Sequence, residues 1–295
     1  MHKVVLYLMN KRGLEVLKTL IEKYSADIIE YVVLSRDPAV QNDYFDELSL
    51  LCVESRIKHF NKDDNYPKYD GYKFAIGWRW MISDCKKLIV LHDSILPKYR
   101  GFSPLVNMLI NGEREIGVTA FFANEDFDRG PIILQNKMEI RYPIKISEAI
   151  DLISTLYQKI VCEVVDKILN EESIIRNTQN EDEASYSVWR NEEDYFIDWS
   201  QNADVINRTI DALGYPYSGA KTNIKDEIIV IEEAEVIEDV VVENRDVGKV
   251  LFIQDSYPVI ICGVGLLKLK KARSIDGNFN LSKIKFRTRF GGKHY

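Results

Sequence analysis

Short apolar runs alternate with amphipathic segments over the first 170 residues. The runs have the length and the β-branched and aliphatic composition of strands; they are Val4–Leu8, Ile28–Leu34, Phe74–Gly77, Leu88–Leu91 and Gly117–Phe122. Three other segments carry apolar residues at helical spacing, and they are Gly13–Tyr24, Asp43–Val53 and Ser147–Leu169. Strands that alternate with helices predict an α/β fold, with a mostly parallel sheet and helices on both faces.

The pattern changes near residue 170. Asn170–Ser187 is polar, acidic and poor in apolar residues, which is typical of a linker. Beyond it we predict one helix at Ala203–Leu213 and a set of short β-rich runs separated by turn residues. These runs are Ile228–Ile231, Val240–Val242, Lys249–Ile253 and Val259–Cys262. We therefore predict two domains, residues 1–178 and residues 188–295, the second of them small, β-rich and barrel-like.

Composition narrows the class of protein. The chain of 295 residues has a formal net charge of −7, which argues against a dedicated nucleic-acid binder. No apolar run has the length of a membrane span, and the first residues contain no signal-peptide cleavage site. Four cysteines are scattered without metal-binding spacing: Cys52, Cys85, Cys162 and Cys262. We expect a cytoplasmic protein that has no metal and no membrane partner.

A histidine directly follows the apolar run Leu88–Leu91. Ligands bind at the carboxyl ends of the strands in open α/β sheets, so His92 stands where chemistry is expected. An imidazole there, followed by the rigid Pro97 and by Gly101, is suited to be a general acid or base. Taken alone, a histidine in this position is more often a structural residue.

An aspartate lies in the turn that follows the predicted strand Gly117–Phe122. Taken alone, Asp128 would be interpreted as a solvated turn residue. A carboxylate can, however, orient an imidazole, select its tautomer and stabilise its charged form. The hypothesis of a catalytic pair, His92 with Asp128, therefore depends on the fold bringing the two side chains together.

Two stretches resemble the signatures of the formyltransferase family that uses 10-formyltetrahydrofolate. The first, His-x-Ser-x-Leu-Pro-x-Tyr-Arg-Gly, begins at His92; the second begins with Gly-Val-Thr at Gly117 and continues with Asp-x-Gly-Pro-Ile-Ile at Asp128. The family includes glycinamide ribonucleotide, methionyl-tRNA and sugar N-formyltransferases. Ile197–Trp199 and Pro216–Ala220 are similar to the smaller domain of the tRNA and sugar members. The resemblance implies a Rossmann-like catalytic domain in which His92 and Asp128 are catalytic.

One family residue is missing. The family has a catalytic asparagine two places before the histidine, and this chain has Val90 there. The asparagine would donate to the oxygen that becomes negative during transfer, and loss of one such donor typically lowers turnover by about 10²–10³. Three explanations stay open: another donor has taken the role, His92 alone supports a slower reaction, or the chain binds ligand without catalysis.

The resemblance also implies where the folate and the acceptor bind. The pterin would be held mainly by backbone groups at Trp80, Met81 and Ile82, with Asp128 closing the other side of the pterin. The residues expected to contact the acceptor are Lys11, Arg12, Ser94, Arg100, Trp189 and Arg190. Cations at the start of a helix can meet phosphates, although solvated charges are the simpler interpretation of Lys11 and Arg12. Trp189 would stack on a base and Arg190 would meet a phosphate.

The acceptor implied is a nucleotide-linked amino sugar. Arg100–Leu105, Asn111–Glu113 and Asp194–Asp198 are most similar to the sugar branch, which implies a UDP- or dTDP-4-amino-4,6-dideoxyhexose, used for surface polysaccharide or glycan synthesis. The resemblance further implies a homodimer that binds no nucleic acid. Methionyl-tRNA formyltransferase is the alternative, since the tail from Lys283 onward is basic. A catalytically disabled folate or nucleotide-sugar binding protein is the second alternative.

Overall fold

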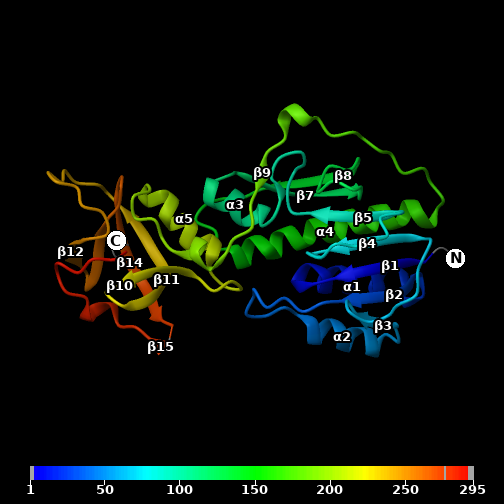
Figure 1. Cartoon of the computed structure of the whole chain (residues 1–295), viewed down its shortest axis with the longest axis horizontal. Coiled ribbons are helices and arrows are strands. Elements are labelled where there is room, and N and C mark those ends of the chain that lie inside the picture. Colours follow the sequence, from blue (N-terminus) through cyan, green and yellow to red (C-terminus); the bar gives the residue numbers. More distant parts are fainter. Residues whose placement is uncertain (1–2, 276, 292–295) are drawn as a thin grey trace. The chain divides into compact units, whose positions relative to one another are not determined.

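A computed structural model describes residues 3–275 and 277–291. The chain forms two compact units, whose elements are labelled in Figure 1. Unit 1 extends to Trp189, and unit 2 contains the residues from Arg190 onward. Unit 2 also takes in 106–113 and 141–147, two short segments that the sequence placed inside the first domain.

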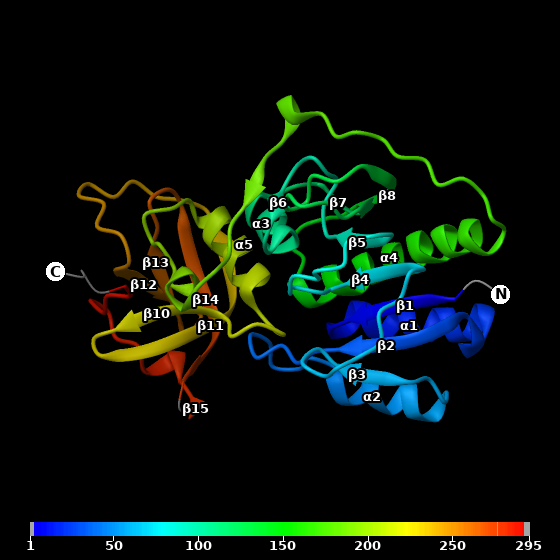
Figure 2. The ribbon, with the colours of Figure 1, turned by 45° about the vertical axis from the view of Figure 1, so that its right-hand side comes forward.

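The core of unit 1 is a seven-stranded sheet with the order β3-β2-β1-β4-β5-β7-β8, seen side by side in Figure 2. Its strands are β1 (Val4–Leu8), β2 (Ile29–Leu34), β3 (His59–Asn61), β4 (Tyr72–Ile76), β5 (Leu88–His92), β7 (Glu115–Phe122) and β8 (Ile132–Glu139). The five strands β1 to β5 pair with their neighbours in parallel. β7 pairs antiparallel with β5 on one side and with β8 on the other. The predicted mostly parallel α/β sheet is therefore confirmed.

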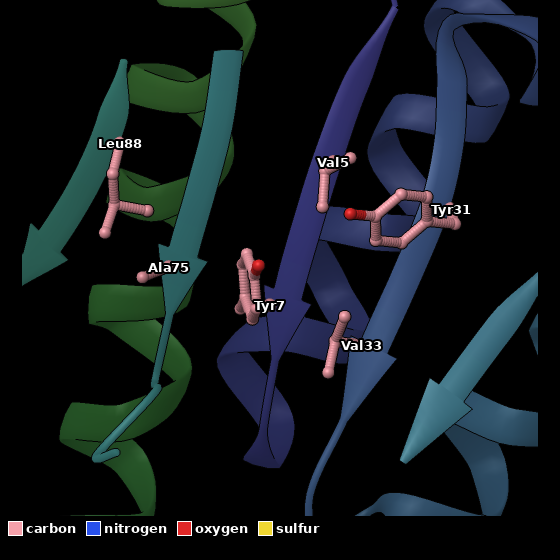
Figure 3. Close-up of a cluster of buried hydrophobic side chains, with 6 residues drawn as sticks. All are labelled: Val5, Tyr7, Tyr31, Val33, Ala75 and Leu88. Carbon is pink, nitrogen blue, oxygen red and sulfur yellow. The ribbon is translucent and has the colours of Figure 1, made fainter. Parts of the chain in front are cut away.

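Helices cover one face of this sheet. They are α1 (Asn10–Tyr24), α2 (Phe45–Glu54) and α4 (Ile146–Leu169). α1 and α4 lie behind the strands in Figure 3, and they are joined by an ion pair between Lys23 and Asp166 and by the Tyr24 hydroxyl, which donates to the Asp166 carboxylate. A further helix, α3 (Pro104–Asn111), follows a two-residue strand, β6 (Arg100–Gly101), which pairs with β9 (Tyr186–Ser187). Short 3₁₀ turns occur at Ala26–Ile28, Glu181–Glu183, Glu192–Tyr195 and Leu281–Lys283.

The opposite face of the sheet differs from the expectation of helices on both faces. Figure 3 shows six side chains that project from β1, β2, β4 and β5 away from α1 and α4. Aromatic and aliphatic residues cover them, and these are Phe60, Tyr66, Tyr69, Trp78, Ile82, Val90 and Ala123. The connections 62–71 and 77–87, which supply four of these residues, contain Pro67, Gly71 and several aspartates, which favour turns over helix. Loop-borne aromatic rings therefore take the place of a helical layer here.

Unit 2 is built on an antiparallel sheet with the order β10-β11-β14-β13-β12. Its elements are α5 (Ala203–Leu213), β10 (Ala220–Ile224), β11 (Glu227–Ile237), β12 (Val250–Gln254), β13 (Tyr257–Ile261), β14 (Leu266–Ser274) and β15 (Gly277–Asn278). Residues 288–291 connect the two edge strands, because the Val250 amide donates to the Thr288 carbonyl and the Gly291 amide donates to the Asn223 carbonyl. This closure gives the predicted barrel-like character. Within the described ranges, no helix has the length and hydropathy needed to cross a membrane.

The prediction of a strand at Val240–Val242 is wrong. These residues form an exposed loop, and 91% of the surface of Val241 is accessible. The cause is Asp239, whose carboxylate accepts from the amides of Val240 and Gly265 and pairs with Arg245. Those interactions turn the chain away from the sheet as β11 ends, so the apolar run has no strand to pair with.

Candidate active site

His92 is the last residue of β5, and its imidazole is 8% exposed. Its Nε2 lies 2.8 Å from the Tyr99 carbonyl oxygen. A carbonyl can only accept a hydrogen bond, so Nε2 carries the proton and the neutral ring has its lone pair on Nδ1. We expected Asp128 to select the tautomer, but the backbone of Tyr99 performs this task.

Asp128 faces the other ring nitrogen of His92. Its Oδ2 lies 3.7 Å from His92 Nδ1 and accepts a 2.7 Å hydrogen bond from the Gly101 amide. The turn is tightly packed, because a Cβ on Gly130 would lie 1.7 Å from the Phe122 carbonyl oxygen. The two predicted catalytic residues therefore meet, at a separation longer than a hydrogen bond. A proton taken up on Nδ1 would be stabilised by the Asp128 carboxylate.

The first signature builds the loop that presents the Tyr99 carbonyl. The Ser94 hydroxyl donates to the Lys98 carbonyl at 2.7 Å, and the Thr119 hydroxyl donates to the Ser94 carbonyl at 2.7 Å. Gln135 donates to the Thr119 hydroxyl and to the Leu96 carbonyl, both at 2.8 Å. Ser94 is fully buried, so the structure contradicts its predicted contact with the acceptor. The threonine of Gly-Val-Thr supports the catalytic loop from β7.

Arg100 was also predicted to contact the acceptor, and the structure contradicts this too. Its side chain is fully buried and donates to Gln179 and to both carboxylate oxygens of Glu181. The hydrogen bond from Arg100 holds the pKa of the Glu181 carboxyl below its usual value. Both partners lie in the segment that the sequence indicated to be a plain linker. Residues 177–187 instead pack on the catalytic loops, with β9 paired to β6.

The two cations at the start of α1 are paired with carboxylates. Lys11 forms an ion pair with Asp151, and the buried Arg12 pairs with Asp93 at 2.5 Å. Asp93 also accepts a hydrogen bond from the hydroxyl of Tyr157. Both cations already pair with carboxylates of the chain, so the structure does not support their predicted role.

The segment expected to hold the pterin leaves its backbone accessible. The side chain of Trp80 is engaged, since its indole nitrogen donates to the Ser35 hydroxyl at 2.9 Å, while Met81 is 70% exposed and Ile82 packs on the apolar face. In the described part of the chain, the amides of Trp80, Met81 and Ile82 donate to no backbone carbonyl. A pterin carries donors and acceptors along one edge, so unpaired backbone groups fit it.

Val90 lies two residues before His92 and therefore on the same face of β5. It is partly buried against the aromatic and aliphatic cluster of Figure 3, and its strand neighbour on β4 is Ala75. The position of the family asparagine thus lies beside His92 but adjoins apolar surface.

The consecutive residues Trp189 and Arg190 fall in different units. In unit 1, the Trp189 ring packs edge-to-face on Phe102, with the guanidinium of Arg79 4.3 Å from its centroid. Trp189 remains 42% exposed and can accept a stacked ring. In unit 2, Arg190 donates to the Asn107 side chain at 2.6 Å, and burial lowers its pKa. The stacking of a base on Trp189 stays a prediction. The predicted contact of Arg190 with a phosphate is not supported by the structure.

No group of three His, Cys, Asp or Glu side chains that could hold a metal occurs in residues 3–275 and 277–291. The sequence missed two groups that shape the site, the Tyr99 carbonyl and the side chain of Gln179. A backbone carbonyl has no residue-type signal, and a glutamine in a polar segment resembles surface.

Comparison with known proteins decides the family. The family model of the formyl transferase matches residues 81–165, and that of the formyl transferase C-terminal domain matches residues 190–279. Together the two regions cover more than half of the chain, in the order that the two units follow. The chain belongs to the formyltransferase family. His92 and Asp128 both lie inside the first matched region.

The relatives of this chain include longer proteins. The bifunctional polymyxin resistance protein ArnA of Wigglesworthia glossinidia brevipalpis is 32% identical over 79% of this chain and 38% of that protein. The methionyl-tRNA formyltransferase of Syntrophomonas wolfei is 33% identical over 46% of this chain and 43% of that enzyme. The chain thus matches about two fifths of the length of each relative.

A solved structure shares the fold over nearly the whole chain. It is the N-formyltransferase of Helicobacter canadensis in complex with folinic acid and dTDP-3-aminofucose. The TM-score is 0.67 at 18% sequence identity, and the match covers 92% of this chain and 99% of the other. The α/β sheet and the β-rich second unit are therefore a formyltransferase fold.

Proposed function

We propose that this chain transfers the formyl group of 10-formyltetrahydrofolate to the amino group of a nucleotide-linked amino sugar. The observation that carries the proposal is the His92–Asp128 pair at the end of β5, with the lone pair of His92 Nδ1 facing the carboxylate at 3.7 Å. Family membership supports the reaction class. The fold shared with an enzyme bound to dTDP-3-aminofucose supports the acceptor class.

The folate, when bound, supplies the formyl group. Trp80, Met81 and Ile82 would hold its pterin through their backbone amides, which donate to no backbone carbonyl in the described part of the chain, and the turn of Asp128 would close the other side of the pterin. The side chain of Trp80 is fixed by Ser35 and by Arg79, whose guanidinium lies 5.2 Å from the ring centroid, so it acts as a wall.

The proton of the attacking amine goes to His92. An amine that attacks a carbonyl carbon becomes an ammonium and must lose a proton, and Nδ1 is the free acceptor of the neutral ring. Nε2 keeps its hydrogen bond to the Tyr99 carbonyl throughout, which holds the ring in one orientation. Asp128 then balances the imidazolium charge until the bond between the formyl carbon and N10 of the folate breaks and His92 gives the proton to that departing nitrogen. General base catalysis of this kind typically contributes about 10²–10⁴ in rate.

Val90 gives the carbonyl oxygen no side-chain donor, whereas an asparagine would. We propose that the protonated ring of His92 and backbone amides stabilise the negative oxygen, at a turnover about 10²–10³ below that expected with a full donor set. This proposal combines two of the three explanations left open by the sequence, a replacement donor and a slower reaction.

The nucleotide of the acceptor is proposed to stack on Trp189. The ring of Trp189 is fixed from behind by Phe102 and by the Arg79 guanidinium, and it is partly exposed. Pre-positioned aromatic surface recognises a base at little entropic cost. We also propose a homodimer, to be tested by light scattering on the purified protein.

The test is a panel of UDP- and dTDP-linked 3-amino and 4-amino sugars, each incubated with 10-formyltetrahydrofolate. Mass spectrometry should find a formyl mass gain on one class, in wild type but not in His92→Ala. The acceptor proposal is overturned if no amino sugar is formylated while methionyl-tRNA is.

Methionyl-tRNA formyltransferase is the second candidate. It is favoured by the relatives that carry this name and by the basic residues Lys283, Lys285 and Arg287. Binding of tRNA should weaken steeply as salt rises, since phosphate contacts release counterions, whereas binding of a nucleotide sugar should change much less. A titration at two salt concentrations therefore separates the candidates.

A further inference from the structure

We infer that Gln179 is a positioning residue that holds the Asp128 turn against the loop of His92. The inference rests on the proposed function, because it assigns a role in the reaction of that same site. Gln179 belongs to the segment between α4 and β9, outside both family signatures. It is 6% exposed, which is unusual for a glutamine in a polar segment.

Every hydrogen-bonding group of the Gln179 side chain is used. Its amide nitrogen donates to the carbonyls of Asp128 and Gly130, both at 2.8 Å. Its amide oxygen accepts from Arg100 Nε at 3.1 Å and from Arg100 Nη2 at 2.8 Å. Only a side chain with two donors and an acceptor can make this bridge. Gln179 therefore joins the turn of Asp128 directly to β6.

The bridge closes a ring of contacts around the catalytic pair. β6 begins directly after Tyr99, whose carbonyl fixes the tautomer of His92. The next residue after Arg100, Gly101, donates its amide to Asp128 Oδ2 at 2.7 Å. The Tyr99 carbonyl, which binds Nε2 of His92, and Asp128, which faces Nδ1, are thus connected through Arg100 and Gln179. The distance of 3.7 Å between Nδ1 and Oδ2 follows from this ring.

The Asp128 turn needs such support. Asp128 has φ +55°, in the left-handed region, which costs a non-glycine residue energy although aspartate tolerates it better than most. The backbone around Gln179 is itself anchored, since Asn177 and Ile132 exchange two backbone hydrogen bonds of 2.7 and 2.8 Å. A fixed glutamine can therefore hold a turn that its own sequence disfavours.

The decisive variant is Gln179→Glu. It keeps an acceptor for Arg100 but replaces both donors with oxygen, so the carbonyls of Asp128 and Gly130 lose their partner. A displacement of about 1 Å at a catalytic group can cost about 10²-fold, and we expect kcat to fall by about 10–100-fold with KM for both substrates nearly unchanged. The matched control is Glu181→Gln, which alters the exposed partner of the same Arg100 and should change kcat by less than about threefold.

A second readout needs no substrate. The imidazole nitrogen resonances of His92, measured by NMR on the free protein, should shift in Gln179→Glu and remain in place in Glu181→Gln. If Gln179→Glu does not fold, Gln179→Met, which has similar volume and no hydrogen bonds, is measured in its place. Unchanged His92 resonances together with a normal kcat, or an equal loss in Glu181→Gln, would overturn the inference. If the wild type formylates no acceptor, the proposed function fails, and the resonances alone decide the role of Gln179.

Discussion

Two buried polar clusters flank the end of β5, and they differ in how tightly they are paired. Asp93, directly after His92, is bound by Arg12 from α1 and by the hydroxyl of Tyr157 from α4, with Arg12 at 2.5 Å. On the other side, His92 and Asp128 stay 3.7 Å apart. The first cluster is a close ion pair that fixes helices to the sheet. The second leaves a nitrogen lone pair unused, which is the condition for moving a proton.

The comparison teaches that burial and charge do not by themselves mark a catalytic group. Both clusters combine a carboxylate with a cation or a potential cation, and both are largely buried. The unfilled hydrogen-bonding capacity beside His92 distinguishes them. Substitutions in the two clusters should therefore separate activity from stability.

The largest effect is expected for His92→Ala. Removing the proton acceptor should lower kcat/KM by about 10²–10⁴, because general base catalysis contributes about this much. The melting temperature should change little, since the ring makes a single hydrogen bond, to the Tyr99 carbonyl. Asp128→Asn is the companion variant and should lose less, because the base is kept. A His92→Ala enzyme with near-normal turnover would remove the mechanism.

Asp93→Asn should have the opposite profile. It leaves the Arg12 guanidinium, in a side chain only 10% exposed, without its counter-charge. Breaking a buried pair on one side costs about 3 kcal/mol in the free energy of unfolding, measurable by urea denaturation. The exposed pair between Lys23 and Asp166 joins the same two helices, and Lys23→Gln should leave the free energy of unfolding nearly unchanged. Equal losses in the two variants would contradict the contrast.

Asp211, in α5 of unit 2, is a third largely buried carboxylate. Its cation partner lies farther away than Arg12 lies from Asp93. Burial raises its pKa to about 6, and the nearest cation, Lys145, is 3.8 Å away. The folded protein then holds a proton between about pH 4 and 6 that the unfolded chain releases, so stability falls as pH rises through this window and is level above it. Asp211→Asn should raise the unfolding free energy at pH 8 by about 1–2 kcal/mol, somewhat less than the full shift at 1.36 kcal/mol per pKa unit.

The pH dependence supplies the control for Asp211. Below about pH 4 the wild-type carboxyl is protonated in both states, so the advantage of the asparagine variant should disappear. Thermal melts at several pH values between 3.5 and 8 would follow this. An advantage that is the same at every pH would point to packing instead of charge.

The smallest loss of activity is expected for Val90→Asn. The residue lies beside His92 on the same face of β5, so an amide there can reach the reacting carbonyl if the family geometry is kept. We expect kcat to fall by no more than about tenfold, and to rise by up to about 10²–10³ where the restored donor reaches the reacting oxygen. A severe loss would mean that the apolar contact of Val90 with the cluster of Figure 3 shapes the site.

The sequence predicted the features that follow from hydrophobic periodicity and from the family motifs. The strands that carry His92 and Thr119, the meeting of His92 with Asp128 and the change of architecture after residue 170 could all be read from it. Pairings between distant residues could not. Three cations were assigned to the substrate: Arg12, Arg100 and Lys11. Their carboxylate partners lie between about 80 and 140 positions away in the chain, so the sequence alone could not show that they are paired. The prediction of a strand at Val240–Val242 was wrong because Asp239 turns the chain away from the sheet.

Residues 288–291 have a consequence for how this protein can be handled. They form backbone hydrogen bonds with the edge strand β12 and with the edge strand β10 of the sheet in unit 2. A version shortened at residue 287 would leave the Val250 amide of β12 and the Asn223 carbonyl of β10 without these partners, and unpaired groups at a sheet edge can pair with a second copy of the chain. Expression vectors should therefore keep this stretch.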